Sequence, residues 1–222
     1  MIAETVTPTQ ATLDTRAPIM ERLRAETRGP HERVEAATFS AAITQERISA
    51  RAYVAQLHAW RVFIGALERA LDARAQTDPL LDAIWHPDTQ HKTHRLDADL
   101  AHLDPDATGT HPIAQRAACA YAASLADAST LTLLGHLYVH EGSALGGLVL
   151  RKHLSRTLGL DRDGLAFHAG HGRETMAHWR AFTSRMNAAP LSMAQQDAVI
   201  QAANDAFDRT GEVLVALSEL VA

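Results

Sequence analysis

A histidine near the N-terminus belongs to the first group of residues that could do chemistry together. His31 and Glu35 are four positions apart in a stretch that reads as helix, so their side chains share one face. Arg24 stands two turns earlier. A neutral imidazole is the usual proximal ligand of a haem iron, a carboxylate can orient that imidazole, and arginine suits the anionic haem propionates. The group is compatible with haem ligation, although a histidine beside a glutamate is more often a solvated surface pair.

The second group is a run of glycines inside what reads as one long helix. Gly142 and Gly146 are four residues apart and share a helix face, and Gly147 follows directly. A glycine inside a helix costs about 1 kcal/mol relative to alanine, so three of them need a reason. A face without side chains lets a flat or bulky group approach the backbone, and glycines also mark kinks. A tight crossing with another helix is the alternative explanation.

In this order and spacing, the two groups resemble signatures of the haem oxygenase family. The similar positions are Thr27-x-x-x-His31-x-x-x-Glu35 for the proximal signature and Gly142-x-x-x-Gly146-Gly147 for the distal one. Further similarities lie at Glu68, at Arg95 with Asp99-Leu100, and at Ser184-Arg185-Met186-Asn187. The resemblance extends from about residue 23 to residue 220. The form Glu141-Gly142-Ser143 is most similar to bacterial members thought to supply biliverdin to phytochrome photoreceptors.

The resemblance implies an all-α, single-domain helical bundle in which a glycine-kinked distal helix lies across one face of the haem. It implies that His31 ligates the iron, that Glu35 helps to orient His31, and that the glycines at 142, 146 and 147 let the distal backbone lie against the porphyrin. The haem would be both substrate and cofactor. Oxygen and electrons from an external ferredoxin or flavin reductase would convert it to biliverdin, carbon monoxide and Fe²⁺, for bilin supply to a bacterial phytochrome or for iron release.

The haem propionates need cationic partners. By resemblance, Arg24 is the candidate for one propionate. Many family members carry basic residues where this chain has Trp179 and Thr183, so the second propionate would need another partner. Arg180 and Arg185 are the two candidates for it.

The distal segment departs from the family pattern at two positions. Many members place an aspartate directly after the first distal glycine, where it holds a water that helps to activate oxygen; this chain has Ser143 there. An arginine of the same network is replaced by Val139. Ser143, Gly142 and Gly146 are therefore the catalytic candidates, with His140 or Glu141 as sources of a missing polar group.

These departures keep two other functions open. A serine can hold a water but carries no charge, which favours a non-enzymatic haem-binding protein on the same fold as the alternative to an oxygenase. A third possibility is a different enzyme on this scaffold, because thiamin-degrading and quinone-cofactor enzymes share related folds and fold does not fix function.

Other metal centres fit the sequence poorly. His140-Glu141 begins a zinc-protease pattern, but Ala144 occupies the position of the second histidine. The paired Glu-x-x-His motifs of di-iron bundles are absent from the sequence. His91 and His94 could form a surface metal pair, but solvated histidines are the more common outcome.

The spacing of apolar residues indicates helices throughout, with alanine and leucine recurring at intervals of three and four. Gly29-Pro30 should interrupt the first helical stretch, and Ser192 with Gln195 should form a capping box. Asp104 to Gly109 should be a loop. The expected helices are 19–28, 31–42, 49–73, 79–85, 92–102, 112–126, 129–158, 173–187 and one from 192.

Composition fits one domain. The chain has 222 residues, of which 46% are hydrophobic, and we expect one domain from 17 to 222 after a disordered tail or arm at 1–16. The polar start is unlike a signal peptide, and no apolar run is long enough to cross a membrane. Cys119 is the single cysteine, which fits a reducing cytoplasm. The net charge of −5 argues against nucleic acid and membranes as partners. Most of the 13 histidines should be surface or capping residues.

Overall fold

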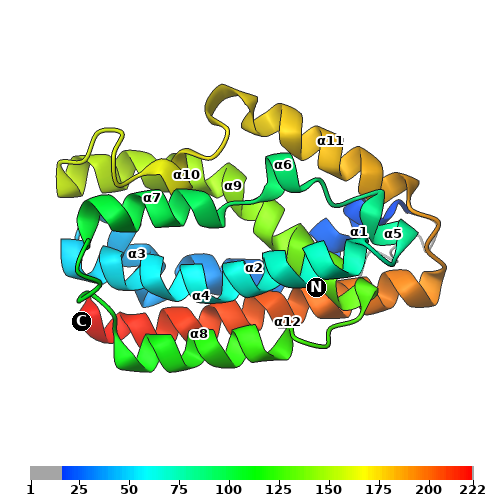
Figure 1. Cartoon of the computed structure of the whole chain (residues 1–222), viewed down its shortest axis with the longest axis horizontal. Coiled ribbons are helices and arrows are strands. Elements are labelled where there is room, and N and C mark those ends of the chain that lie inside the picture. The colour runs from blue at the N-terminus through cyan, green and yellow to red at the C-terminus, as the bar shows by residue number, and fades with distance from the viewer. Residues whose placement is uncertain (1–16, 222) are drawn as a thin grey trace, which may run out of the picture.

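Three long helices form the frame of the molecule: α4 (Ala50–Ala75), α9 (Thr130–Leu158) and α12 (Met193–Leu217). The computed structural model in Figure 1 describes residues 17–221, which form helices and no strands, so the predicted tail at 1–16 lies outside the described residues. Helix α9 packs on α12, and α4 packs on α7 (Thr93–Leu103) and α8 (Pro112–Ser124). The all-α fold expected from the sequence is confirmed.

Capping residues set the ends of the long helices. The side chains of Ser49 and Ser129 accept hydrogen bonds from the first turns of α4 and α9. Ser192 and Gln195 form the predicted capping box at the start of α12. Gly159 ends α9 with a φ of 68°, a left-handed conformation that favours glycine.

The N-terminal part divides into three short helices: α1 (Ile19–Glu26), α2 (Arg28–Ala36) and α3 (Thr38–Thr44). The predicted break at Gly29-Pro30 is wrong, because the chain breaks at Thr27 instead. The Thr27 hydroxyl donates to the carbonyl of Leu23, 2.7 Å away, which satisfies one carbonyl at the end of α1. Pro30 is accommodated in the first turn of α2, where a helix needs no amide hydrogen.

Shorter helices complete the bundle. The predicted helix 79–85 is shorter than expected, and two four-residue helices were not predicted; one of them, α10, is capped by a residue that is distant in sequence. For example, the Asp99 carboxylate accepts from the amides of Ala166 and Phe167 at 2.7 and 2.8 Å and so caps α10. The remaining elements are α5 (Pro79–Asp82), α6 (Pro87–Gln90), α10 (Ala166–Ala169), the 3₁₀ turn Gly172–Glu174, α11 (Thr175–Ala188) and the 3₁₀ turn Ser218–Leu220.

A close helix crossing lies at Gly135, where α9 meets α12. A Cβ atom at Gly135 would lie 2.5 Å from the carbonyl oxygen of Val199 and 2.6 Å from the amide nitrogen of Ala203. Leu134 and Leu137 are fully buried on either side of it. The tight crossing considered for the glycine run therefore occurs two turns earlier, at a different glycine.

Within residues 17–221, no helix is both long enough and apolar enough to cross a membrane.

Candidate functional site

His31 lies on an exposed helix. Its side chain is 52% exposed, and its Nδ1 lies 3.5 Å from a carboxylate oxygen of Glu35, whose side chain is 68% exposed. The ring meets the ring of Phe207 on α12 edge-on, with centroids 5.6 Å apart. Every residue of α2 keeps some solvent exposure. The predicted His31–Glu35 pair is thus present, on a helix face that the rest of the described chain leaves accessible.

Tyr138 of α9 lies near the residues that precede α2. The Thr27 side chain and the charge of Arg24 are close enough to influence its pKa. Burial raises the pKa of Tyr138, while Thr27 and Arg24 oppose the rise. Thr27 lies one turn before His31, and Tyr138 lies one turn before Gly142. The residues one turn before the two segments that resemble the family signatures therefore lie near each other.

The three predicted glycines of α9 have different surroundings. A Cβ atom at Gly142 would lie 3.7 Å from the indole ring of Trp179. A Cβ atom at Gly147 would lie 3.3 Å from the carbonyl oxygen of His168, so α10 approaches the helix there. A Cβ atom at Gly146 would meet no atom of the described chain within 4 Å. The glycine face is thus open at Gly146 and bordered by an aromatic ring at Gly142.

Ser143 is exposed, and its hydroxyl is already engaged. The Oγ atom donates to the carbonyl of His140 at 2.7 Å. A hydroxyl has one hydrogen to donate and two lone pairs that accept. This serine therefore presents a hydrogen-bond acceptor to solvent. An aspartate oxygen is also an acceptor, but it carries a negative charge that serine lacks.

The arginine candidates differ in their surroundings. Arg24 and Arg180 are exposed, on α1 and α11. Arg185 is partly buried, and its Nε donates to the carbonyl of Ile84 at 3.1 Å. Burial lowers the pKa of Arg185, and the negative charge of Glu141 partly offsets this. One nitrogen of Arg185 thus holds α11 to the segment after α5, whereas Arg180 is turned to solvent.

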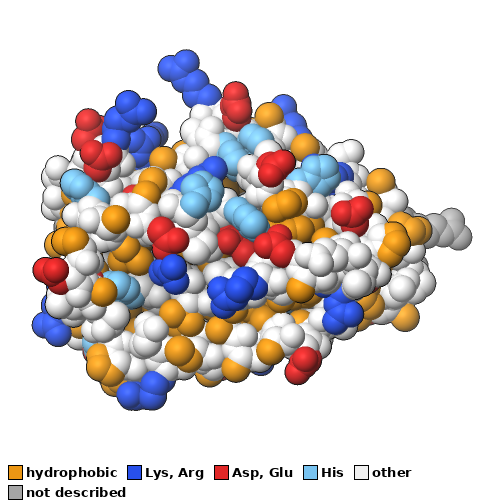
Figure 2. All heavy atoms as spheres, viewed as in Figure 1, with side chains coloured by type: hydrophobic (Ala, Val, Ile, Leu, Met, Phe, Trp, Pro, Cys, Tyr) orange, Lys and Arg blue, Asp and Glu red, His pale blue; other side chains and the backbone are white. Residues whose placement is uncertain are grey.

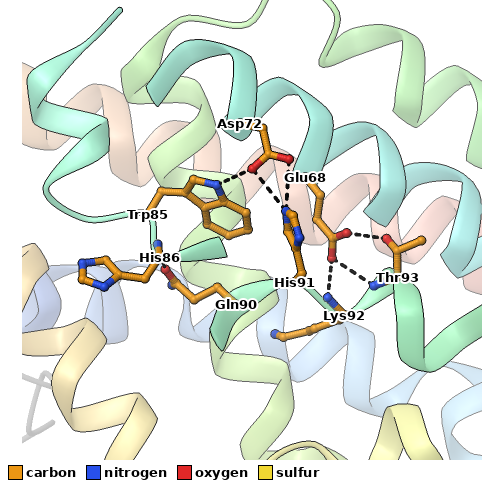
Figure 3. Close-up of polar contacts among 8 residues, drawn as sticks. All are labelled: Glu68, Asp72, Trp85, His86, Gln90, His91, Lys92 and Thr93. Carbon is orange, nitrogen blue, oxygen red and sulfur yellow. Dashed lines mark hydrogen bonds and ion pairs between the residues drawn. The ribbon is translucent and has the colours of Figure 1, made fainter. Parts of the chain in front are cut away.

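A buried polar cluster lies beside the glycine segment, and sequence reasoning missed it. The Lys92 ammonium lies 2.5 Å from the carbonyl oxygen of His140 and 3.0 Å from a carboxylate oxygen of Glu141. Glu68 on α4 accepts from the amides of Lys92 and Thr93 at 2.5 and 3.1 Å, as Figure 3 shows. A carboxylate from another helix thereby caps the start of α7. The scarcity of lysine was the one available signal, since Lys92 and Lys152 are the only two in the chain.

Arg95 lies in the same region. Burial lowers its pKa, and the charges of Glu141 and Glu68 counteract the effect. One of its guanidinium nitrogens lies 3.4 Å from Nδ1 of His171, whose ring stacks on that of His178 at 3.8 Å. Figure 2 shows that histidine side chains gather on this face of the molecule.

The expectation that the histidines lie at the surface is wrong for three of them, because helix packing encloses them. His136, His140 and His168 are at most 7% exposed. Burial lowers the pKa of His136 and of His168 to about 4, and it lowers that of His140 together with the nearby charge of Lys92. These imidazoles are therefore neutral at pH 7. His91, in the proposed surface metal pair, binds Asp72 and lies beside Trp85, as Figure 3 shows.

Comparisons with known proteins agree with this arrangement. Heme oxygenase PigA of Pseudomonas aeruginosa is 29% identical over 196 residues, which are 87% of this chain and 90% of that protein. The structure of heme oxygenase-2 from Synechocystis, in complex with heme and NO, has a TM-score of 0.84 at 20% identity and is similar over 92% of this chain and 87% of that one. The NO- and CO-bound heme oxygenase of Neisseria meningitidis has a TM-score of 0.68 at 27% identity, over 92% and 94% of the two chains.

The family model described as "Heme oxygenase" matches residues 17–216, which is nearly the whole chain. The resemblance first seen in two short motifs thus extends over the described fold, and the chain belongs to the haem oxygenase family.

Proposed function

We propose that this protein is a haem-degrading monooxygenase that converts haem to biliverdin, carbon monoxide and Fe²⁺. The observation that carries the proposal is the pairing of an accessible histidine, His31 beside Glu35, with a glycine face that is open at Gly146. Tyr138 of α9 lies near Thr27, and His31 and Gly142 each follow one turn further along the chain. The residues fit haem, because His31 is accessible and the space over Gly146 is open.

The described residues suit the binding of haem from both sides. His31 would ligate the iron through Nε2, since its Nδ1 is turned toward Glu35. Gly142, Gly146 and Gly147 would bring the α9 backbone against the porphyrin, with the Trp179 ring as a wall beside Gly142. This arrangement would restrict which carbon of the macrocycle faces the reacting oxygen.

Cations at the rim would neutralise the propionates. Arg24 would pair with one propionate from α1, and Arg180 would take the other from α11. Arg185 is the weaker candidate, because its Nε is bonded to the carbonyl of Ile84.

The haem, when bound, supplies the oxygen chemistry, and the chain would supply orientation and a hydrogen-bond acceptor at Ser143. Ser143 would accept a hydrogen bond from a distal water, because its own hydrogen is bonded to His140. Electrons would come from a separate ferredoxin or flavin reductase. The biliverdin would serve a bacterial phytochrome, or the released iron would be the useful product.

A second function is favoured by the same serine. Ser143 carries no charge where many family members carry an aspartate, so a protein that binds haem without degrading it would have the same geometry. The two functions differ in whether bound haem is consumed when a reductant and oxygen are added.

Hemin titration of the wild type and of His31→Ala tests the proposed ligation. The wild type should give a saturable Soret band, and His31→Ala should lose it or show a rearranged one. His153→Ala is a matched control, because His153 also pairs with a glutamate, Glu46, at 3.2 Å. A His31→Ala spectrum identical to that of the wild type would remove His31 from its role.

A further inference from the structure

The buried ammonium of Lys92 holds α9 directly before its first distal glycine. Lys92 is 4% exposed, and Glu141 is 7% exposed. The ammonium contacts both the Glu141 carboxylate and the carbonyl of His140, at 3.0 and 2.5 Å. We propose that Lys92 is a positioning residue that fixes the backbone of the segment 142–147 against which haem would lie. The part of this inference that concerns haem rests on the proposed function, whereas its test is made on the haem-free protein.

The backbone at Lys92 is itself fixed by hydrogen bonds to the Glu68 carboxylate. Glu68 accepts from its amide, and the next residue, Thr93, donates its amide and its hydroxyl to the same carboxylate. One turn along α4, Asp72 accepts from the indole of Trp85 at 2.8 Å and from His91. Figure 3 shows both carboxylates of α4 facing the segment 85–93. A chain of polar contacts therefore runs from α4 through Lys92 to α9.

The contact with the His140 carbonyl matters for the course of α9. This carbonyl accepts from two side chains, the Lys92 ammonium and the Ser143 hydroxyl. Side chains that reach a helix carbonyl are a known cause of bends, because they draw the carbonyl outward. The following segment contains three glycines, which bring no side chains of their own to pack it in place. An external anchor at residue 140 therefore sets where the glycine face begins.

Neutralising the charge of Glu141 does not by itself explain why a lysine occupies position 92. The charge of Glu141 also reaches Arg95 and Arg185, so two other cations lie near this carboxylate. Among these three cations, only the Lys92 ammonium has a hydrogen bond to the His140 carbonyl. A compact ammonium with three donors can serve a carboxylate and a carbonyl at once, whereas a planar guanidinium has a fixed fork geometry. This distinguishes Lys92 from the arginines that supply nearly all other cations of the chain.

Hydrogen exchange of the full-length, haem-free protein tests the inference through the amides of 142–147. Lys92→Met should speed their exchange about tenfold more than that of reference amides at 199–206 of α12. Lys152→Met is the matched control, because Lys152 is exposed on α9, the helix that contains 142–147. It should leave the exchange rates of these amides unchanged. Lys92→Arg keeps a charge beside Glu141 and so protects the fold; it should still speed exchange at 142–147.

A double variant separates positioning from charge balance. In Lys92→Met with Glu141→Met, no buried charge is left without a partner, so stability should recover. Exchange at 142–147 should stay fast, because the His140 carbonyl still lacks its ammonium. Wild-type exchange in the double variant or in Lys92→Arg would contradict the inference, as would a rise in Lys92→Met that is no larger than that of the reference amides.

A spectroscopic measurement extends the test to the loaded protein. In the carbon monoxide complex, the C–O stretching band should shift or broaden in Lys92→Met but not in Lys152→Met, because the distal backbone borders the bound gas. An unchanged band in a Lys92→Met complex would contradict the inference. If the wild type binds no haem, the proposed function fails, and the exchange measurement still decides whether Lys92 positions α9.

Discussion

At the scale of single residues, the chemistry of the distal side depends on what Ser143 can offer. Its hydrogen is bonded to the carbonyl of His140, so only its lone pairs face outward. A water that donates to this oxygen would be held as it is by an aspartate oxygen, but without the stronger attraction of a charged acceptor. In the proposed function, Ser143 would therefore substitute for the aspartate with reduced strength.

Substitutions at this position give the first prediction. Ser143→Ala removes one hydrogen-bond acceptor, worth about 1 kcal/mol, so turnover should fall about fivefold. The dissociation constant for haem should stay within about twofold, because no haem contact is lost. Ser143→Asp should turn over haem at least as fast as the wild type. Reductant-driven biliverdin formation measures all three proteins, and full activity in Ser143→Ala would show that the hydroxyl holds no essential water.

The residues at the site divide into those that a sequence can reveal and those that it cannot. His31, Glu35 and the distal glycines were identified because their spacing is local and fixed by the helix repeat. Lys92 was not identified, because nothing near it in sequence shows that its ammonium reaches a helix some fifty positions away. The Trp179 ring against Gly142 was missed for the same reason.

At the scale of the element, the glycines of α9 serve two different purposes. Gly135 allows a close approach to α12, where any side chain would overlap backbone atoms. Gly146 has open space over it, so packing within the described chain does not require a glycine there. One helix thus contains a glycine that packing requires and, about three turns later, a glycine that packing within the described residues does not require.

Adding a methyl group by substitution with alanine should therefore have opposite effects on the free energy of unfolding at Gly135 and Gly146. Gly135→Ala should lower the free energy of unfolding by about 2 kcal/mol or more, because the methyl group meets backbone that cannot move aside. Gly146→Ala should raise it by up to about 1 kcal/mol through helix propensity, yet weaken haem binding about tenfold. Urea unfolding and hemin titration measure the two quantities. Unchanged haem affinity in Gly146→Ala would separate this glycine from the haem site.

Helix positions were predictable where local signals were strong. The predicted ranges matched both ends of α9 and the start of α12 within about one residue, because capping is a local interaction. The break near residue 29 was misplaced, because the Thr27 hydroxyl closes α1 before the proline is reached. Helix α10 was missed because its cap, Asp99, lies 67 positions away in sequence.

At the scale of the whole molecule, buried histidines link stability to pH. Packing holds the pKa of His136 and of His168 at about 4, whereas an unfolded histidine titrates near 6.5. Between these values the unfolded chain binds protons that the folded chain does not, so stability falls as pH falls through this window. Above about pH 6.5 both states are neutral at these positions, and the full stability is present.

A variant at position 168 tests this linkage. Between pH 7 and pH 5, the free energy of unfolding should drop by about 1–2 kcal/mol for each buried histidine. His168→Met should make the pH dependence shallower, and it removes an Nε2 atom that has no hydrogen-bond partner within the described residues. Urea unfolding at several pH values gives the slopes. Equal slopes for the variant and the wild type would mean that His168 is not buried and neutral.

Hemin titration followed by reduction in air tests the central claim most directly. Purified protein loaded with hemin receives ascorbate or a ferredoxin and its reductase, and the absorption spectrum is followed with time. The account predicts a Soret band that decays while the broad red absorption of biliverdin rises. A Soret band that persists with both electron donors would contradict the oxygenase and leave a haem-binding protein, and the absence of any Soret band would contradict haem binding itself.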